Sequence, residues 1–398
     1  MEHPIFFYIF ASMTKKICFL MDSIFSFGGV QRVTAVIAKE LAKEYAVTIV
    51  TLEKPDEKDT SIYDLQEADI QYRFFEYPDT PRWKDILCKA YSYLYRKMLP
   101  QNKLTSDLYA HSSFPSEKRD ALAKELQQGH YDVVIGVHAP LAVRLAACKK
   151  QLEGIKLIGW IHNSHKALFG KESRYLGPEL QKHYEWQLEK LDKTVVLCEY
   201  DAKEYPIPTQ VIYNPLTLVP GKPSKGTSKK FLAVGRFSPL HKGFDILIQA
   251  FALFAENNKE WTLDIVGEGP EEEAFRNLIA KNKLEGRISI HPFTKEIQKY
   301  YSEAQVYVLS SRWEGLPLVL IEAMAHGLPI ISSDLTMSKE IMGDFGMYFK
   351  NGDANELARS LEEATKTDWE KKSKEALTIA SRFNAEAIVQ QWKDIINE

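Results

Sequence analysis

One stretch decides the fold: VYVLSSRWEGLPLVLIEAMAHGLPIIS at residues 306–332. Val306–Leu309 is a short apolar run rich in β-branched residues, and Pro329–Ser332 closes the stretch with a second one. Between them a helical pattern begins near Pro317, a residue that suits the first helical position because it lacks an N–H. Strand, helix and strand in this order predict a parallel α/β unit.

The same alternation extends outward over nearly the whole chain. Because 398 residues exceed what one core usually fills, we expect two α/β domains with doubly wound, Rossmann-like sheets. Tyr205–Lys230 carries five prolines and a run rich in lysine, glycine and serine, which is typical of a linker. The predicted domains are residues 13–209 and 210–383. The expected strands are Ile17–Met21, Val47–Thr51, Asp132–Val137, Lys156–Ile161 and Thr194–Cys198, then Phe231–Val234, Thr262–Val266, Ile288–Ile290, Val306–Leu309 and Pro329–Ser332.

Composition and charge narrow the class of protein. A net charge of -3 gives no overall field for nucleic acid, so we expect no nucleic-acid partner. The four cysteines form no Cys-x-x-Cys pair, which argues against a zinc site and favours a reducing, cytoplasmic location. Residues 1–12 include an apolar run too short to span a bilayer, and we expect them to lie outside the fold.

Two acidic residues eight positions apart mark the first candidate site. Glu314 lies in the loop before the predicted helix and Glu322 lies within that helix. The N–H groups of Leu318 and Val319 at the helix start would be unpaired and would attract an anion. A carboxylate beside a ribose can accept hydrogen bonds from two hydroxyls. The alternative is a capped surface helix with incidental acids.

Two cations follow the strand Phe231–Val234. Arg236 comes directly after Gly235, and Lys242-Gly243 opens the next helix. Two cations beside a helix start can bind a diphosphate and stabilise the charge that grows on it during bond cleavage. Basic residues in a loop are, however, often merely solvated.

Two weaker signals lie in the first half of the chain. Gly28-Gly29 ends the first strand, where glycines let backbone N–H groups approach a phosphate, although an ordinary tight turn would look the same. His162 follows a buried strand and would face a ligand cleft at its carboxyl end. A histidine there can equally make structural hydrogen bonds.

Together these motifs resemble glycosyltransferase family 4, a retaining family with the two-domain GT-B fold. The resemblance rests on Gly-Gly-Val at 28–30, His162, Val-Gly-Arg at 234–236 with Lys242-Gly243, and the pair Glu314/Glu322. It is densest from about residue 210 to residue 335. The motif departs from many family members at Pro317, where glycine would supply an N–H.

The resemblance implies a role for each matched residue. Glu314 would contact the hydroxyls of the transferred sugar, and His162 would lie near the anomeric centre; these are the expected catalytic residues. The expected donor-binding residues are Gly29, Arg236, Lys242, Phe293, Leu318, Val319 and Glu322. The reaction would be metal-independent and cofactor-free transfer from a UDP-sugar or GDP-sugar to a glycan or lipid-linked acceptor, as in bacterial polysaccharide assembly. The helix of residues 384–398 would return to the first domain.

A basic segment predicts a contact with an anionic membrane. Residues 82–103 carry six basic side chains against one acid, and aromatic and aliphatic residues recur there at helical spacing. Such a helix would place a cytoplasmic protein at the inner membrane face. The alternative is a helix that packs its apolar stripe against the sheet.

Two other functions stay open at this point. An epimerase or hydrolase of nucleotide sugars shares the fold and the phosphate contacts, but it needs no acceptor. A non-catalytic partner subunit of the same fold would lose its donor-site residues, yet Arg236, Lys242, Glu314 and Glu322 are all present.

Overall fold

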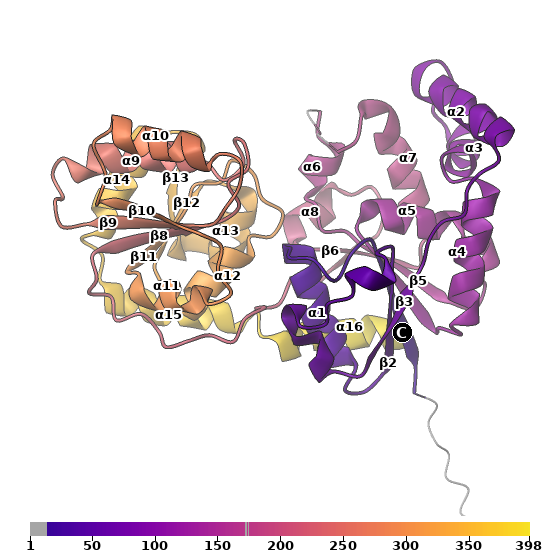
Figure 1. Cartoon of the computed structure of the whole chain (residues 1–398), viewed down its shortest axis with the longest axis horizontal. Helices are drawn as coiled ribbons and strands as arrows, with labels where there is room; N and C mark the ends of the chain where they lie inside the picture. The colour runs from indigo at the N-terminus through magenta and orange to yellow at the C-terminus, as the bar shows by residue number, and fades with distance from the viewer. Residues whose placement is uncertain (1–13, 172, 174) are drawn as a thin grey trace, which may run out of the picture. The chain divides into compact units, whose positions relative to one another are not determined.

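The computed structural model describes residues 14–171, 173 and 175–398 (Figure 1). The chain divides into two compact units. One contains the residues up to Ile161 together with Leu176–Thr194, and the other contains His162–Tyr175 together with Val195–Glu398. The boundary after residue 209 and the return of the last helix stay predictions. The expectation for residues 1–12 falls outside the described part of the chain.

The first sheet has seven strands in the order β3-β2-β1-β4-β5-β6-β7. β1 pairs in parallel with both β2 and β4, which places the β1 strand, fully buried beyond its first residue, at the centre. The order reverses beside β1, as in doubly wound folds. Its strands are β1 (Lys16–Met21), β2 (Ala46–Thr51), β3 (Ile70–Phe74), β4 (Val133–Val137), β5 (Lys156–Trp160), β6 (Lys193–Val196) and β7 (Gln210–Val211).

The second sheet has six strands in the order β10-β9-β8-β11-β12-β13 and repeats this plan. β8 pairs in parallel with β9 and β11, so the chain again winds outward in both directions from a central pair. Its strands are β8 (Lys230–Val234), β9 (Thr262–Val266), β10 (Ile288–His291), β11 (Val306–Leu309), β12 (Ile330–Ser333) and β13 (Met347–Phe349). The prediction of two parallel α/β sheets is confirmed.

Helices cover both faces of the second sheet. Figure 1 shows α9, α10 and α14 on one face and α11, α12 and α15 on the other. The longer helices along the chain are α1 (Gly29–Leu41), α2 (Arg82–Lys97), α3 (Lys103–Ser113), α4 (Ser116–Gln128), α5 (Ala139–Ala147), α7 (Pro178–Leu188), α9 (Phe244–Ala255), α10 (Glu272–Lys281), α12 (Leu318–Ala325), α14 (Ala354–Ala364), α15 (Trp369–Ser381) and α16 (Ala385–Asn397). The shorter ones are α6 (His165–Phe169), α8 (Glu199–Glu204), α11 (Ile297–Glu303) and α13 (Thr336–Met342).

The strands that the sequence did not predict are β3, β7 and β13, and all three lie at sheet edges. β3 has one buried residue, Ile70, and β7 has two residues. An edge strand buries fewer side chains than a central one, so its sequence carries less of the apolar signal on which the prediction relied.

The apolar stripe of α2 does not pack against a sheet, which corrects the alternative stated for residues 82–103. Tyr95 is the one buried residue of this helix, and its ring stacks on Tyr109 of α3 at 4.5 Å. The opposite stripe faces outward. The large exposed side chains of α2, of Met98 after it and of α3 are Trp83, Ile86, Leu87, Tyr93, Leu94, Met98, Leu104 and Leu108. None of the described helices is long and apolar enough to cross a membrane.

Candidate active site

Lys242 and Glu314 form an ion pair at the carboxyl edge of the second sheet. β8 and β11 are neighbouring parallel strands, so the loops that follow them leave the sheet at the same edge. Lys242 lies in the first loop and Glu314 in the second, and their Nζ and Oε1 atoms are 2.7 Å apart. The side chains are 15% and 8% exposed, so the pair is largely shielded from water.

Three neighbours keep the Glu314 carboxylate ionised. Burial raises the pKa of Glu314, but the charges of Lys242 and His241 and hydrogen bonds from Lys242 and Ser311 lower it by more. The pKa of Glu314 therefore lies below its ordinary value. Ser311 Oγ donates to Glu314 Oε1 at 2.5 Å, and His241 Nε2 lies 3.9 Å from Oε2. Sequence reasoning missed His241 and Ser311. Their closeness along the chain to Lys242 and Glu314 was the available signal.

The start of α12 presents backbone amides that precede the first hydrogen bond of the helix. Pro317 is the N-cap of this helix and not its first residue, so the helix begins one residue later than proline statistics suggest. Leu320 N donates to Pro317 O at 3.0 Å, which leaves the amides of Leu318 and Val319 ahead of the first helical hydrogen bond. These amides follow the Glu314 loop directly, as the anion-site prediction requires.

Two predicted donor residues are solvent-exposed. The Arg236 side chain makes no hydrogen bond or ion pair with the residues that the structure describes. Phe293 follows β10 and is 48% exposed. Both side chains are therefore accessible to a ligand.

Glu322 is buried inside the second unit and is 2% exposed. Tyr301 donates its hydroxyl to Glu322 Oε2 at 2.9 Å, and Thr217 Oγ1 lies 3.5 Å from Oε1. His326 is neutral because burial lowers its pKa. Its Nδ1 atom is hydrogen-bonded to Glu322 O, and its Nε2 atom accepts from Gly221 N. The predicted ribose ligand thus has internal partners, and a ribose would have to approach Oε1 from the side of Thr217.

His162 lies beside the Glu314 loop within the second unit. A Cβ atom added to Gly315 would lie 2.8 Å from His162 O, so only glycine allows this close approach. His162 is buried, with 7% of the residue exposed. The structure thus places the two predicted catalytic residues near each other in space.

Gly29 is the first residue of α1 and belongs to the first unit. Tyr63 fixes the preceding turn, because its hydroxyl accepts from Gly28 N at 2.7 Å and lies 3.1 Å from Gly28 O. The amide of Gly29 has no helical partner at this position.

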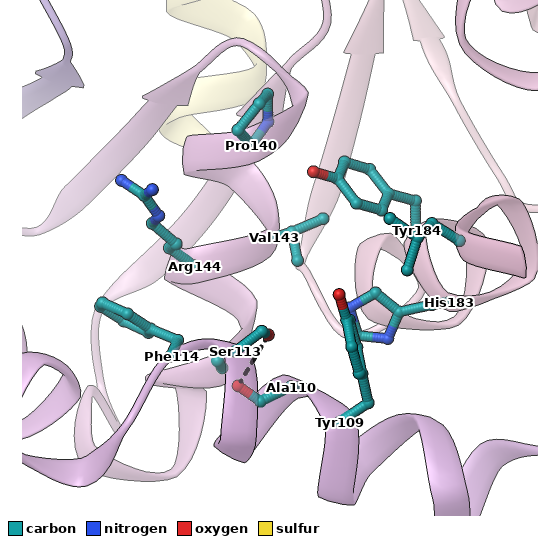
Figure 2. Close-up of a pocket in the computed structure, with 11 residues that line it drawn as sticks. Tyr109, Ala110, Ser113, Phe114, Pro140, Val143, Arg144, His183 and Tyr184 are labelled. Carbon is teal, nitrogen blue, oxygen red and sulfur yellow. Dashed lines mark hydrogen bonds between the residues drawn. The ribbon is translucent and has the colours of Figure 1, made fainter. Parts of the chain in front are cut away.

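A pocket of about 160 Å³ lies elsewhere in the first unit (Figure 2). It is enclosed by α3, α5 and α7, and its walls carry the rings of Tyr109, Phe114, His183 and Tyr184. Burial lowers the pKa of His183 to about 4, so this histidine is neutral. The pocket contains none of the predicted site residues.

Comparison with known proteins agrees with this arrangement. The model described as Glycosyltransferase Family 4 matches residues 27–218, and the model described as Glycosyl transferases group 1 matches residues 218–382. The chain belongs to glycosyltransferase family 4. An uncharacterized glycosyltransferase from Haemophilus influenzae is 28% identical over 396 residues, which cover 96% of this chain and 100% of that protein.

Further relatives of this family 4 glycosyltransferase support the same assignment. The amylovoran biosynthesis glycosyltransferase AmsD of Erwinia amylovora is 34% identical over 172 residues, which cover 42% of this chain and 48% of AmsD. Two solved structures share the fold over 96% of this chain and 99% of theirs: TarM at a TM-score of 0.72 and 14% identity, and HepE from Anabaena in complex with UDP at 0.73 and 18%. The predictions of a glycosyltransferase and of the GT-B fold are confirmed.

Proposed function

We propose that this glycosyltransferase transfers a sugar from a nucleotide-diphosphate donor with retention of configuration and without a metal ion. The observation that carries the proposal is the Lys242–Glu314 pair, whose Glu314 loop leads directly into the first amides of α12, those of Leu318 and Val319. A cation and two helix-start amides together match a diphosphate. A UDP-sugar is the first candidate donor and a GDP-sugar the second, since the similar structure of HepE was solved with UDP.

The proposed chemistry assigns separate tasks to the charged residues. As the glycosidic bond breaks, negative charge grows on the leaving diphosphate, and Lys242, Arg236 and the α12 amides stabilise it. Glu314, ionised beside Lys242, accepts hydrogen bonds from hydroxyls of the transferred sugar. His162 lies close to the anomeric carbon, Glu322 and Phe293 contact the nucleoside, and Gly29 approaches the phosphate.

A donor screen tests this assignment. Binding of UDP-, GDP- and ADP-sugars is measured by thermal shift for the wild-type chain and for Lys242→Ala. We expect one donor class to stabilise the wild type and to lose at least tenfold in affinity for the variant, which keeps its fold. Full donor affinity and turnover in Lys242→Ala would remove the proposed role.

Further assays separate this proposal from its alternatives. Sugar interconversion or release in incubations with donor alone, at the rate seen with acceptor, would indicate an epimerase or hydrolase instead. Turnover that stops in EDTA would contradict metal independence. The anomeric configuration of the product, read by NMR coupling constants, decides between retention and inversion.

We propose further that the acceptor is lipid-linked and that the outer face of α2 and α3 lies on an anionic membrane. The eight exposed apolar side chains of this face are each 40% to 73% exposed, and the same two helices carry five exposed basic residues: Arg82, Lys89, Arg96, Lys97 and Lys103. Apolar side chains can enter the headgroup region while the basic ones bind anionic lipids.

Vesicle sedimentation tests the membrane proposal. Reversing the charges of Lys89, Arg96 and Lys97 should release the protein from phosphatidylglycerol vesicles. A matched control reverses the exposed Lys366, Lys371 and Lys374 of the second unit and should leave binding intact. Equal sedimentation of both variants with the wild type would show that this face does not bind lipid electrostatically.

A further inference from the structure

The two loops that carry Lys242 and Glu314 are joined by contacts other than the ion pair between these two side chains. We call residues 235–243 the Lys242 loop and residues 310–317 the Glu314 loop. Ser310 Oγ donates to Lys242 O at 2.8 Å. The His241 ring lies 4.9 Å from the Trp313 ring at an interplanar angle of 10°. The two loops therefore form one structural element at the sheet edge.

Arg312 makes the densest set of these contacts. Its NH1 and NH2 groups donate to Asp245 Oδ1 at 2.9 Å and Oδ2 at 2.7 Å, a two-pronged pairing that only arginine provides. NH1 also donates to Leu240 O at 2.8 Å. The Arg312 amide donates to His241 O at 2.8 Å. One residue of the Glu314 loop thus bonds to both sides of Lys242.

Leu240 shows that these contacts hold a conformation the Lys242 loop would not adopt alone. Its φ angle is +59°, in the left-handed region that non-glycine residues rarely enter. Its side chain is 56% exposed, so burial of the leucine does not compensate for this conformation. The hydrogen bond from Arg312 to the Leu240 carbonyl and the one from the Arg312 amide to His241 O can maintain it.

We propose that Arg312 is a positioning residue for donor binding: through Asp245 and the Leu240 carbonyl it fixes the distance between Lys242 and Glu314. This inference rests on the proposed function, since it assigns a purpose to the donor residues named there. Arg312 itself need not touch the donor.

Because the Arg312–Asp245 ion pair is partly exposed, a role in positioning Lys242 can be distinguished from a role in global stability. The side chains of Arg312 and Asp245 are 24% and 36% exposed, so this pair is partly open to solvent, and its loss should cost less global stability than the loss of a fully buried pair. A displacement of Lys242 by about 1 Å, in contrast, can cost on the order of 100-fold in activity. We therefore expect loss of Arg312 to weaken donor binding strongly and to lower the melting temperature only slightly.

Arg312→Lys is the test variant, because lysine keeps the charge but cannot bond both Asp245 oxygens and Leu240 O. We expect hydrogen exchange in peptides covering residues 238–243 to accelerate at least tenfold and UDP affinity, measured by calorimetry, to fall at least tenfold. The matched control is Arg276→Lys in the same unit, where Arg276 pairs with Glu272 on an exposed helix face. It should change neither quantity. Unchanged exchange in Arg312→Lys would overturn the inference.

A second substitution shows whether Arg312 acts through Leu240. Glycine adopts positive φ without strain, so Leu240→Gly in the Arg312→Lys background should recover part of the lost UDP affinity. Recovery of none would contradict positioning through Leu240, because lysine keeps the charge of Arg312 and the lost affinity would then need another cause. If the wild type binds none of UDP, GDP and ADP, the proposed function fails, and the exchange measurement alone still decides whether Arg312 orders the loop.

Discussion

Replacing Lys242 with methionine removes the cation of the central ion pair while keeping most of the side-chain volume. At 2.7 Å and an effective dielectric constant of about 20, the gross attraction within the pair is roughly 6 kcal/mol. Removing one partner of a buried pair costs about 3–5 kcal/mol in measured cases. Ser311 and His241 still support Glu314, so we expect the lower end, about 3 kcal/mol.

This loss should appear in thermal unfolding, followed by circular dichroism. For a domain of about 150–250 residues, each 1 kcal/mol shifts the melting temperature by roughly 2–4 °C, so the shift should be about 6–12 °C. The matched control is Lys229→Met, since Lys229 pairs with Glu260 on the exposed surface of the same unit. That variant should stay within about 0.5 kcal/mol of the wild type.

The pH dependence gives the sharper test. In the wild type the pKa of Glu314 is lowered, so its stabilisation is complete above the ordinary pKa and is lost as the pH falls through the lowered one. Without Lys242, burial favours the protonated carboxyl group, which needs no cation. The stability gap between the variant and the wild type should therefore be smaller at pH 5 than at pH 8, and Glu314→Gln should partly restore Lys242→Met. An equal gap at both pH values would refute this account of the pair.

Two predictions concern residues outside this pair. Tyr63→Phe removes a hydroxyl that bonds to Gly28 and should lower the free energy of unfolding, measured by urea titration, by about 1–2 kcal/mol. Tyr72→Phe should lower it little, because the Tyr72 hydroxyl is buried without a hydrogen-bond partner among the described residues. Equal losses would mean that the Gly28 contact does not order the turn. Burial raises the pKa of Asp201 to about 6 from 3.8, which penalises the folded state as the pH rises through this range. Asp201→Asn should thus stabilise the protein by about 1–3 kcal/mol at pH 8 and by little at pH 4; destabilisation at pH 8 would contradict the burial argument.

The central strands and the loops after them could be predicted from the sequence. Val306–Leu309 is apolar because the strand is buried on both faces, and its observed bounds equal the predicted ones. The same pattern could not reveal β3, where the polar Gln71 and Arg73 lie in a partly exposed edge strand. Periodicity reports burial, so it fails where a strand is only partly buried.

Side-chain pairing in the site was less accessible to sequence reasoning. The motifs placed Lys242 and Glu314 in loops that each follow a predicted strand. They could not show that the two side chains meet, nor that Leu240 and Gly243 adopt left-handed conformations in the first of these loops. Glu322 was predicted to contact the ribose, which stays a prediction; no sequence pattern indicated that Tyr301 donates to its carboxylate. Helical position alone gives no information about which partner from another element covers a side chain.

A crystal structure of the chain with UDP tests the central claim most directly. We predict that the diphosphate oxygens lie within hydrogen-bond distance of Lys242 Nζ, of the Arg236 guanidinium and of the amides of Leu318 and Val319, with Glu322 facing the ribose. A nucleotide bound away from the α12 start, or one whose diphosphate contacts neither Lys242 nor these amides, would contradict the account.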